Sequence, residues 1–139
     1  MGEPVLVGLL FADRIITEDN GKKGIIGTFN RFQSEKYPVV FPTWGIYAAV
    51  TNLTGSHEFA VNLVADGTGQ VIIPIAGHFD VTAVTDVVEL TPTIVGAVFP
   101  SSGKYTMTFH IDGNIIGART LFVEQGEQSS RPGKAPGKK

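Results

Sequence analysis

Three histidines, His57, His78 and His110, are the residues with the most obvious potential for acid–base or metal chemistry. Their spacings match no local metal-binding motif, and the sequence contains neither HExxH nor HxxxH. His78 and Asp80 lie two residues apart, so they would share one face of a strand and could orient each other. Catalysis would also need a nucleophile or a third partner, and no recognisable pattern supplies one. We therefore predict that the protein is not an enzyme.

The other residue types that carry chemistry point the same way. The chain has no cysteine, which excludes a disulfide framework and thiolate ligands. None of its serines stands in a GxSxG motif, and no glycine-rich phosphate loop is present. The segment Asp66-Gly-Thr-Gly69 lacks the alternating acidic ligands of a calcium loop. We expect no cofactor and no metal.

Length and composition indicate one folded domain with a basic tail. At 139 residues, 42% hydrophobic and 17% charged, the chain is typical of a single globular domain, which we place at residues 1–125. Residues 126–139 are rich in Pro, Gly and Lys, and they carry four basic residues against one acidic residue, a net charge of +3. Such a segment buries too little apolar area to order itself, so we predict a disordered tail. Because the whole chain has a charge of −2, the remaining residues sum to −5, which disfavours nucleic acid as a partner.

The N-terminal segment predicts neither export nor a membrane anchor. Residues 5–11 are apolar, but the run is far shorter than the roughly 18 residues that span a bilayer. Glu3 stands where a signal peptide would carry Lys or Arg. We expect a cytoplasmic protein that does not bind membranes.

Alternating polar and apolar residues predict an all-β fold. In residues 103–111, Tyr105, Met107, Phe109 and Ile111 alternate with polar residues, and Asp112-Gly113 then favours a type I′ hairpin turn. Further strands are expected at 5–17, 25–32, 43–52, 57–65, 70–76 and 87–99, with Pro74 marking an edge strand. About eight strands and no long helix predict two packed antiparallel sheets, an immunoglobulin-like sandwich.

In two of the expected strands, apolar residues stand at both odd and even positions, so both faces of the strand would be apolar. Pairing across Asp112-Gly113 places Phe109 opposite Ile116, which turns Ile115, Leu121 and Val123 outward beside Arg119; Val71, Ile73 and Ile75 similarly oppose Ile72. Either a bulge shifts the register and buries these side chains, or they form an exposed interaction surface. The candidate surface is Val71, Ile73, Ile115, Arg119 and Leu121.

Two functions follow from these patterns. The first is a non-enzymatic interaction or structural module, which self-associates or binds a protein partner through sheet faces or edges. The alternative is a small-ligand module, with carbohydrate as the ligand, using the loop aromatics Tyr37, Trp44 and Tyr47. The position of Trp44 discriminates between them, because a sugar-stacking ring must reach solvent.

Several segments carry a family resemblance. They are LLFADRIITEDNGKKGIIGTFNRF, the loop with Pro38 and Pro42, HEFAVNLVADGTGQVI and FPSSGKYTMTFHIDGNIIG. Together they resemble, in the same order, a family of small bacterial immunoglobulin-like domains of unknown function, over roughly residues 6–123. The resemblance implies a β-sandwich, a bacterial or phage origin and a cytoplasmic setting, and it brings no catalytic residues. Gly103-Lys-Tyr105 also looks like the tyrosine corner of such sandwiches, a structural role.

Overall fold

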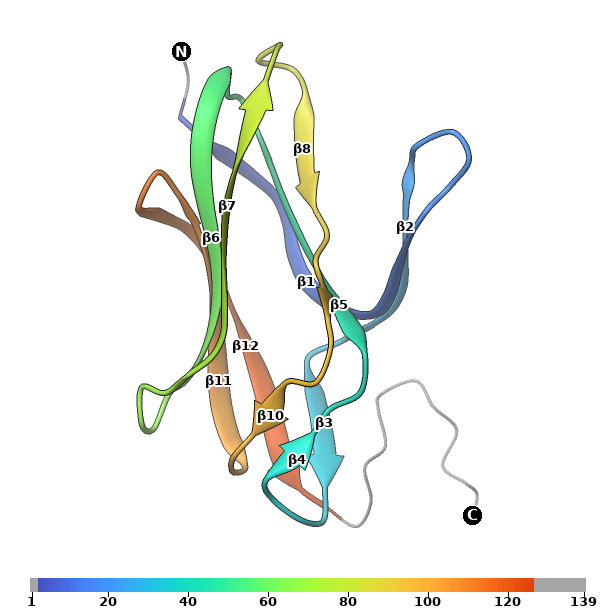
Figure 1. Cartoon of the computed structure of the whole chain (residues 1–139), viewed down its shortest axis with the longest axis vertical. Helices are drawn as coiled ribbons and strands as arrows, with labels where there is room; N and C mark the ends of the chain where they lie inside the picture. Colours follow the sequence, from blue (N-terminus) through green and yellow to red (C-terminus); the bar gives the residue numbers. More distant parts are fainter. Residues whose placement is uncertain (1–2, 127–139) are drawn as a thin grey trace.

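The computed structural model describes residues 3–126, which fold as two packed five-stranded β-sheets (Figure 1). Val39–Val40 and Val98–Phe99 pair with each other as a third, two-stranded sheet. The predicted disordered tail lies outside the described residues except for Gly126. Across residues 3–126, no helix is long and apolar enough to span a bilayer. The strands are β1 Val5–Thr17, β2 Lys23–Phe29, β3 Arg31–Ser34, β4 Val39–Val40, β5 Trp44–Thr51, β6 Gly55–Ala65, β7 Val71–Val81, β8 Val87–Leu90, β9 Thr93–Ile94, β10 Val98–Phe99, β11 Gly103–Ile111 and β12 Asn114–Gln125.

The first sheet has the order β2-β1-β5-β8, and β9 also pairs with β5. The long strand β1 has the predicted bounds, and β2 pairs only with its second half, from Phe11 to Thr17. β5 lies in the middle of the sheet and is buried on both faces from Trp44 to Val50. Its small residues Gly45, Ala48 and Ala49 fit this position, because a central strand between neighbours leaves little room for large side chains.

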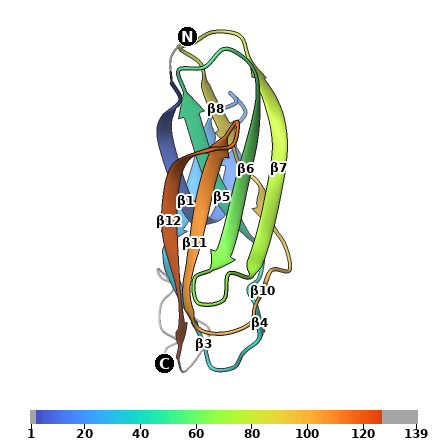
Figure 2. The same ribbon diagram turned by 90° about the vertical axis from the view of Figure 1, so that its left-hand side faces the viewer.

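The second sheet has the order β3-β12-β11-β6-β7, and Figure 2 shows β12, β11, β6 and β7 side by side. Its pairings are antiparallel except for β3, which runs parallel to the end of β12. β7 is the edge strand, as Pro74 predicted. The alternation predicted for β11 is confirmed, since Tyr105, Met107, Phe109 and Ile111 are all buried.

The core between the sheets is rich in aromatic rings. Phe99 contacts Phe32, Phe41 and Tyr105, with ring centroids 5.1, 6.4 and 5.0 Å away. The Tyr105 hydroxyl donates a 2.6 Å hydrogen bond to the Ser101 carbonyl oxygen, four residues upstream. This is the tyrosine corner that Gly103-Lys-Tyr105 indicated. The chain is an all-β, immunoglobulin-like sandwich, as its sequence predicts.

The strand number exceeds the predicted eight because two expected strands are divided, and because β4, Val39–Val40, lies in the segment expected as the loop with Pro38 and Pro42. The strand expected at 25–32 breaks at Asn30, and the chain passes from the first sheet in β2 to the second sheet in β3. The strand expected at 87–99 becomes β8, β9 and β10, interrupted at Pro92 and at Gly96, which has a φ of 75°. Proline removes a ladder donor, and a left-handed φ turns the strand aside.

Bulges account for both strands with apolar residues on two parities. In the closing hairpin the register shifts between Phe109 and His110, so Phe109 pairs with Gly117 and not with Ile116. Of the two alternatives, the structure therefore has the bulge: Leu121 and Val123 are buried, with 0% and 1% of their surface exposed, and do not face outward as the unbulged register predicts. In β7 a second shift, opposite Leu63 and Val64, leaves Ile72 as an extra residue.

Candidate functional site

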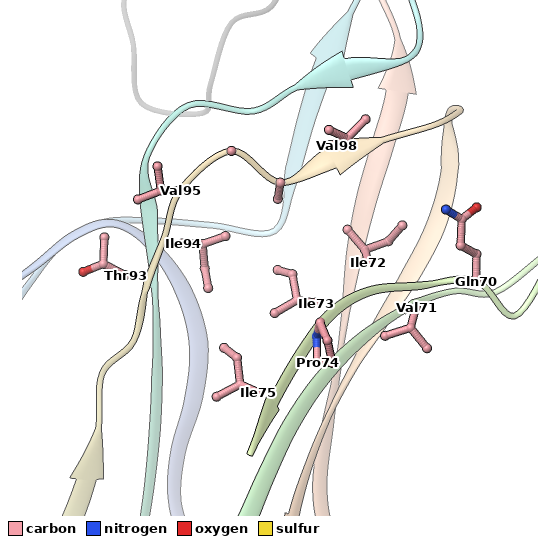
Figure 3. Close-up of a pocket in the computed structure, with 12 residues that line it drawn as sticks. Gln70, Val71, Ile72, Ile73, Pro74, Ile75, Thr93, Ile94, Val95 and Val98 are labelled. Carbon is pink, nitrogen blue, oxygen red and sulfur yellow. The ribbon is translucent and has the colours of Figure 1, made fainter. Parts of the chain in front are cut away.

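An apolar groove lies between two sheet edges, with β7 as one wall and the β9–β10 segment as the other. Residues 70–75 and 93–98 line it, and it encloses about 530 Å³. Ile72, Ile73 and Ile75 on β7 lie opposite Ile94 on β9 (Figure 3). Because the two walls belong to different sheets, the groove is the lateral opening of the sandwich on this side.

Local sequence explains why this side stays open. β7 is the last strand of its sheet, and Pro74 has no N–H with which to pair a further strand. On the opposite wall, Gly96 adopts a left-handed φ of 75° between two strands of only two residues each. β9 is therefore too short to extend the first sheet over β7, and β10 pairs with β4 instead.

The groove offers apolar contact and no charge. Its twelve lining residues include no Asp, Glu, Lys, Arg or His. Ile73 and Ile94 form its floor, each 6% exposed, whereas Val71, Val95 and Val98 stand at its rim with 51%, 74% and 48% of their surface exposed. Three exposed valines beside a buried isoleucine floor give the groove an uncharged lining, which polar atoms share with apolar ones.

The candidate surface predicted from sequence divides into two places. Val71 and Ile73 line the groove on β7. Ile115, 61% exposed, and Arg119 lie on β12, which β11 and β6 separate from β7. Arg119 donates a 3.3 Å hydrogen bond to the Leu9 carbonyl oxygen. Ile73 and Leu121 are buried at 6% and 0% exposure, so at these two positions the burial alternative holds and they are not part of an exposed surface; the β12 bulge accounts for Leu121.

The three aromatic residues of the sugar-binding hypothesis do not form a common exposed site. Trp44 is 1% exposed within the core, and its indole N–H has no acceptor among the described residues. The Tyr47 hydroxyl donates a 2.5 Å hydrogen bond to Glu89, and burial together with this bond raises the pKa of Tyr47 to about 12. The Tyr37 hydroxyl donates a 2.6 Å bond to the Glu124 carbonyl oxygen, and burial raises its pKa as well. Stacking a sugar on Trp44 would therefore require the core to open.

The side chains of the sequence-based enzyme hypothesis lie on β7 beyond residues 70–75, the part of the strand that lines the groove. His78 and Asp80 are both exposed; Asp80 accepts a hydrogen bond from the Ser56 hydroxyl, and His78 lies across from Glu58 in the ladder. Within residues 3–126, no group of three or more His, Asp or Glu side chains is placed to hold a metal ion.

His57 on β6 forms a charged pair with Asp112 in the turn between β11 and β12, and we call this pair the His57–Asp112 clamp. Its Nδ1 lies 2.7 Å from Asp112 Oδ2 and its Nε2 lies 2.8 Å from the Thr54 carbonyl oxygen. Both ring nitrogens thus face acceptors, which favours the imidazolium, in which both nitrogens are donors. The hydrogen bond to Asp112 is the main cause that raises the pKa of His57, and the same bond lowers the pKa of Asp112.

We expect this clamp to stabilise the fold within a defined pH window. Because folding raises the pKa of His57, the protonated ring stabilises the folded state. This contribution is complete at pH values below the ordinary pKa of 6.5, and it is lost as the pH rises through the folded-state pKa. Because folding lowers the pKa of Asp112, its ionised carboxylate also stabilises the folded state. This contribution is complete at pH values above the ordinary pKa of 3.8, and it is lost as the pH falls through the folded-state pKa. Urea unfolding of wild type and His57→Gln should therefore differ most between about pH 4 and 6.5 and converge at alkaline pH. Curves that stay parallel from pH 5 to 9 would contradict the clamp.

Sequence reasoning missed one wall of the groove. Residues 93–98 were expected as the second part of a strand that bends at Pro92 or lies at an edge, whereas β9 and β10 belong to different sheets. The sequence feature that could have predicted the break between β9 and β10 is Gly96, a residue suited to a left-handed φ, which follows the exposed Val95.

Comparison with known proteins gives a family and several structural neighbours. A family model described as a family of unknown function (DUF6941) matches residues 8–124. No curated protein matches the chain. Similar solved structures include the CARDB domain of a Pyrococcus furiosus protein in complex with di-metal ions, with a TM-score of 0.44 at 11% identity, covering 86% of this chain and 94% of that one. An immunoglobulin-like protein from Pseudomonas aeruginosa has a TM-score of 0.41 at 9% identity, covering 88% and 97%. The alkylpurine DNA glycosylase AlkC of Pseudomonas fluorescens, bound to DNA with an abasic site analog, has a TM-score of 0.43 at 7% identity, covering 84% and 30%.

Proposed function

We propose that this chain, which belongs to DUF6941, a family of unknown function, is a non-enzymatic protein-interaction module whose groove between β7 and β9–β10 binds an apolar segment of a partner protein. The observation that carries the proposal is the exposed, uncharged rim of Val71, Val95 and Val98 above a buried isoleucine floor. Covering that rim would remove apolar surface from water at about 25 cal/mol per Å².

The shape and lining of the groove favour a polypeptide segment over a small polar ligand. Gln70 and Thr93 are the only lining residues with polar side chains, whereas a sugar site needs several convergent polar groups beside an exposed ring. Side chains on one face of an extended segment recur about every 6.6 Å, so several aliphatic side chains could enter a groove that follows a strand. Since Pro74 interrupts the free ladder of β7, the affinity should come mainly from side-chain packing.

The lining also favours binding over catalysis. General acid–base and nucleophilic steps require titratable or nucleophilic side chains in contact with the substrate. The groove contains no titratable side chain, and its one hydroxyl, that of Thr93, has no base among the lining residues. A partner bound there would therefore be held and not modified.

A selection from a displayed library of random 12-residue peptides tests this function. We expect the full chain to select peptides with aliphatic residues at alternating positions. Substituting Val71→Asp together with Val98→Asp should weaken the binding of a selected peptide, measured by fluorescence anisotropy, by about tenfold or more, because each change places a carboxylate against apolar surface.

Val87→Asp is the matched control. Val87 is 48% exposed, as Val98 is, but it lies on β8 and does not line the groove. The control should retain wild-type affinity. The proposal fails if the selected peptides bind wild type and the Val71→Asp, Val98→Asp variant equally well, or if no peptide is enriched over an unrelated sandwich domain.

A further inference from the structure

The second half of β1 and all of β2 form a two-stranded arm that projects away from the second sheet (Figure 1). β2 is the edge strand of the first sheet, so one side of its backbone has no neighbouring strand. The arm exposes apolar side chains, with Ile16, Ile25 and Ile26 at 39%, 37% and 42% exposure. Ile25 and Ile26 are adjacent and therefore point to opposite faces of the arm. Two-stranded ribbons of this kind gain stability from a third strand.

Two of the charged residues on the arm, Asp13 and Lys23, lie on the two sides of Ile25. The register that pairs Ala12 with Thr28 and Arg14 with Ile26 places Asp13 opposite Gly27. Gly27 has a φ of 72°, and a Cβ atom built on it would lie 2.5 Å from Asp13 Oδ2. The Asp13 carboxylate thus lies over the Gly27 backbone, above the edge strand itself. Lys23 lies on the same face of β2, as far before Ile25 as Gly27 lies after it.

We propose that β2 pairs antiparallel, edge to edge, with β2 of a second copy of this chain, about a two-fold axis at Ile25. In this register Ile25 opposes Ile25 of the second copy, and Lys23 opposes Gly27 of the second copy. Because Asp13 covers Gly27, each Lys23 ammonium meets the Asp13 carboxylate of the other copy, and the dimer contains two such pairs. No like charges oppose each other directly along the strands in this register.

This pairing is independent of the groove and goes beyond the proposed function. β2 and the β8 and β9 strands lie at opposite edges of the first sheet, so a dimer through β2 leaves the groove open. A seven-residue edge buries less area than the 1,200 to 2,000 Å² or so of stable interfaces. The dimer should therefore be weak and reversible and should accumulate with protein concentration.

Cross-linking at the two-fold axis tests the proposed register. The chain has no cysteine, so Ile25→Cys introduces a single thiol at the axis, and Ile115→Cys introduces one at a more exposed isoleucine on β12. A short bis-maleimide should join two Ile25→Cys chains about tenfold faster than two Ile115→Cys chains, because paired residues lie roughly 5 Å apart. Equal rates, or faster cross-linking of Ile115→Cys, would overturn the proposal.

Charge reversal tests the complementarity. Sedimentation of the full chain across a wide concentration range should show a mass rising from 14.8 kDa towards twice that value. Lys23→Glu should raise the dimer dissociation constant about tenfold, and Asp13→Lys combined with Lys23→Glu should restore it. Lys104→Glu, an exposed lysine on β11, should leave association unchanged. A wild-type mass of 14.8 kDa at every concentration would contradict the dimer, as would a dissociation constant that Lys23→Glu leaves unchanged. If the double variant does not fold, the cross-linking rates of Ile25→Cys and Ile115→Cys decide the question.

Discussion

Leu121→Ala is expected to lower the free energy of unfolding by about 3 kcal/mol, whereas Ile115→Ala should change it by less than about 0.5 kcal/mol. Both residues are large aliphatics on β12, and simple alternation from the hairpin turn places both outward. The bulge at Phe109 and His110 separates them: Leu121 is fully buried in the core, and Ile115 is 61% exposed. Truncating Leu121 leaves a cavity in a closely packed core, while truncating Ile115 removes contacts with solvent only.

Urea unfolding of the two variants, followed by tryptophan fluorescence, measures the difference. Trp44 is a suitable reporter because it is 1% exposed in the native state and becomes solvated on unfolding. Equal effects at the two positions, or a larger effect at Ile115, would show that β12 pairs in the unbulged register.

Phe99→Ala should lower the free energy of unfolding by about 4 kcal/mol. Phe99 belongs to a strand of two residues, yet it is 0% exposed and contacts the rings of Phe32, Phe41 and Tyr105. Removing the ring leaves a void shared by three aromatic neighbours, and aromatic contacts are lost in addition to buried area.

Val98→Ala provides the control from the adjacent position. Val98 is 48% exposed at the rim of the groove, so its truncation should change the free energy of unfolding by less than about 0.5 kcal/mol. Thermal unfolding by circular dichroism would report both variants. If Phe99→Ala were as mild as Val98→Ala, the β10 segment would not pack into the core as described.

Local patterns predicted the parts of the fold that local physics determines. The bounds of β1, the alternation of β11, the turn at Asp112-Gly113 and the edge position of Pro74 all follow from side-chain period or backbone restriction. Asp112 and Gly113 have φ values of 50° and 85°, as a type I′ turn requires. The tyrosine corner at Tyr105 followed from the residues around it.

Features that depend on pairing between distant strands were not visible in the sequence. A bulge moves a whole strand face by one residue, and nothing local to Leu121 distinguishes its burial from the exposure of Ile115. The passage from β2 to β3 at Asn30, and the parallel pairing of β3 with β12, depend on partners about 90 residues away, such as the 3.2 Å pair of Arg31 and Glu124.

The candidate site shows the same division. Val71 and Ile73 were found because their strand is apolar on both parities. The facing wall, including Ile94 and Val98, was missed because its neighbours in space come from another sheet. Trp44 was named as a ligand residue from its aromatic type, although the pairing of β5 between β1 and β9 places it in the core.

An apolar segment of the partner protein is expected to bind in the groove between β7 and β9–β10. Methyl nuclear magnetic resonance of the isoleucine and valine side chains, recorded while a selected peptide is added to the full chain, tests it most directly. We expect the largest shifts at Ile73, Ile94 and Val98, with Ile115 and Val87 unchanged. Shifts concentrated at Ile115, or at Ile25 and Ile26 on the arm, with the groove methyls unmoved, would contradict the claim.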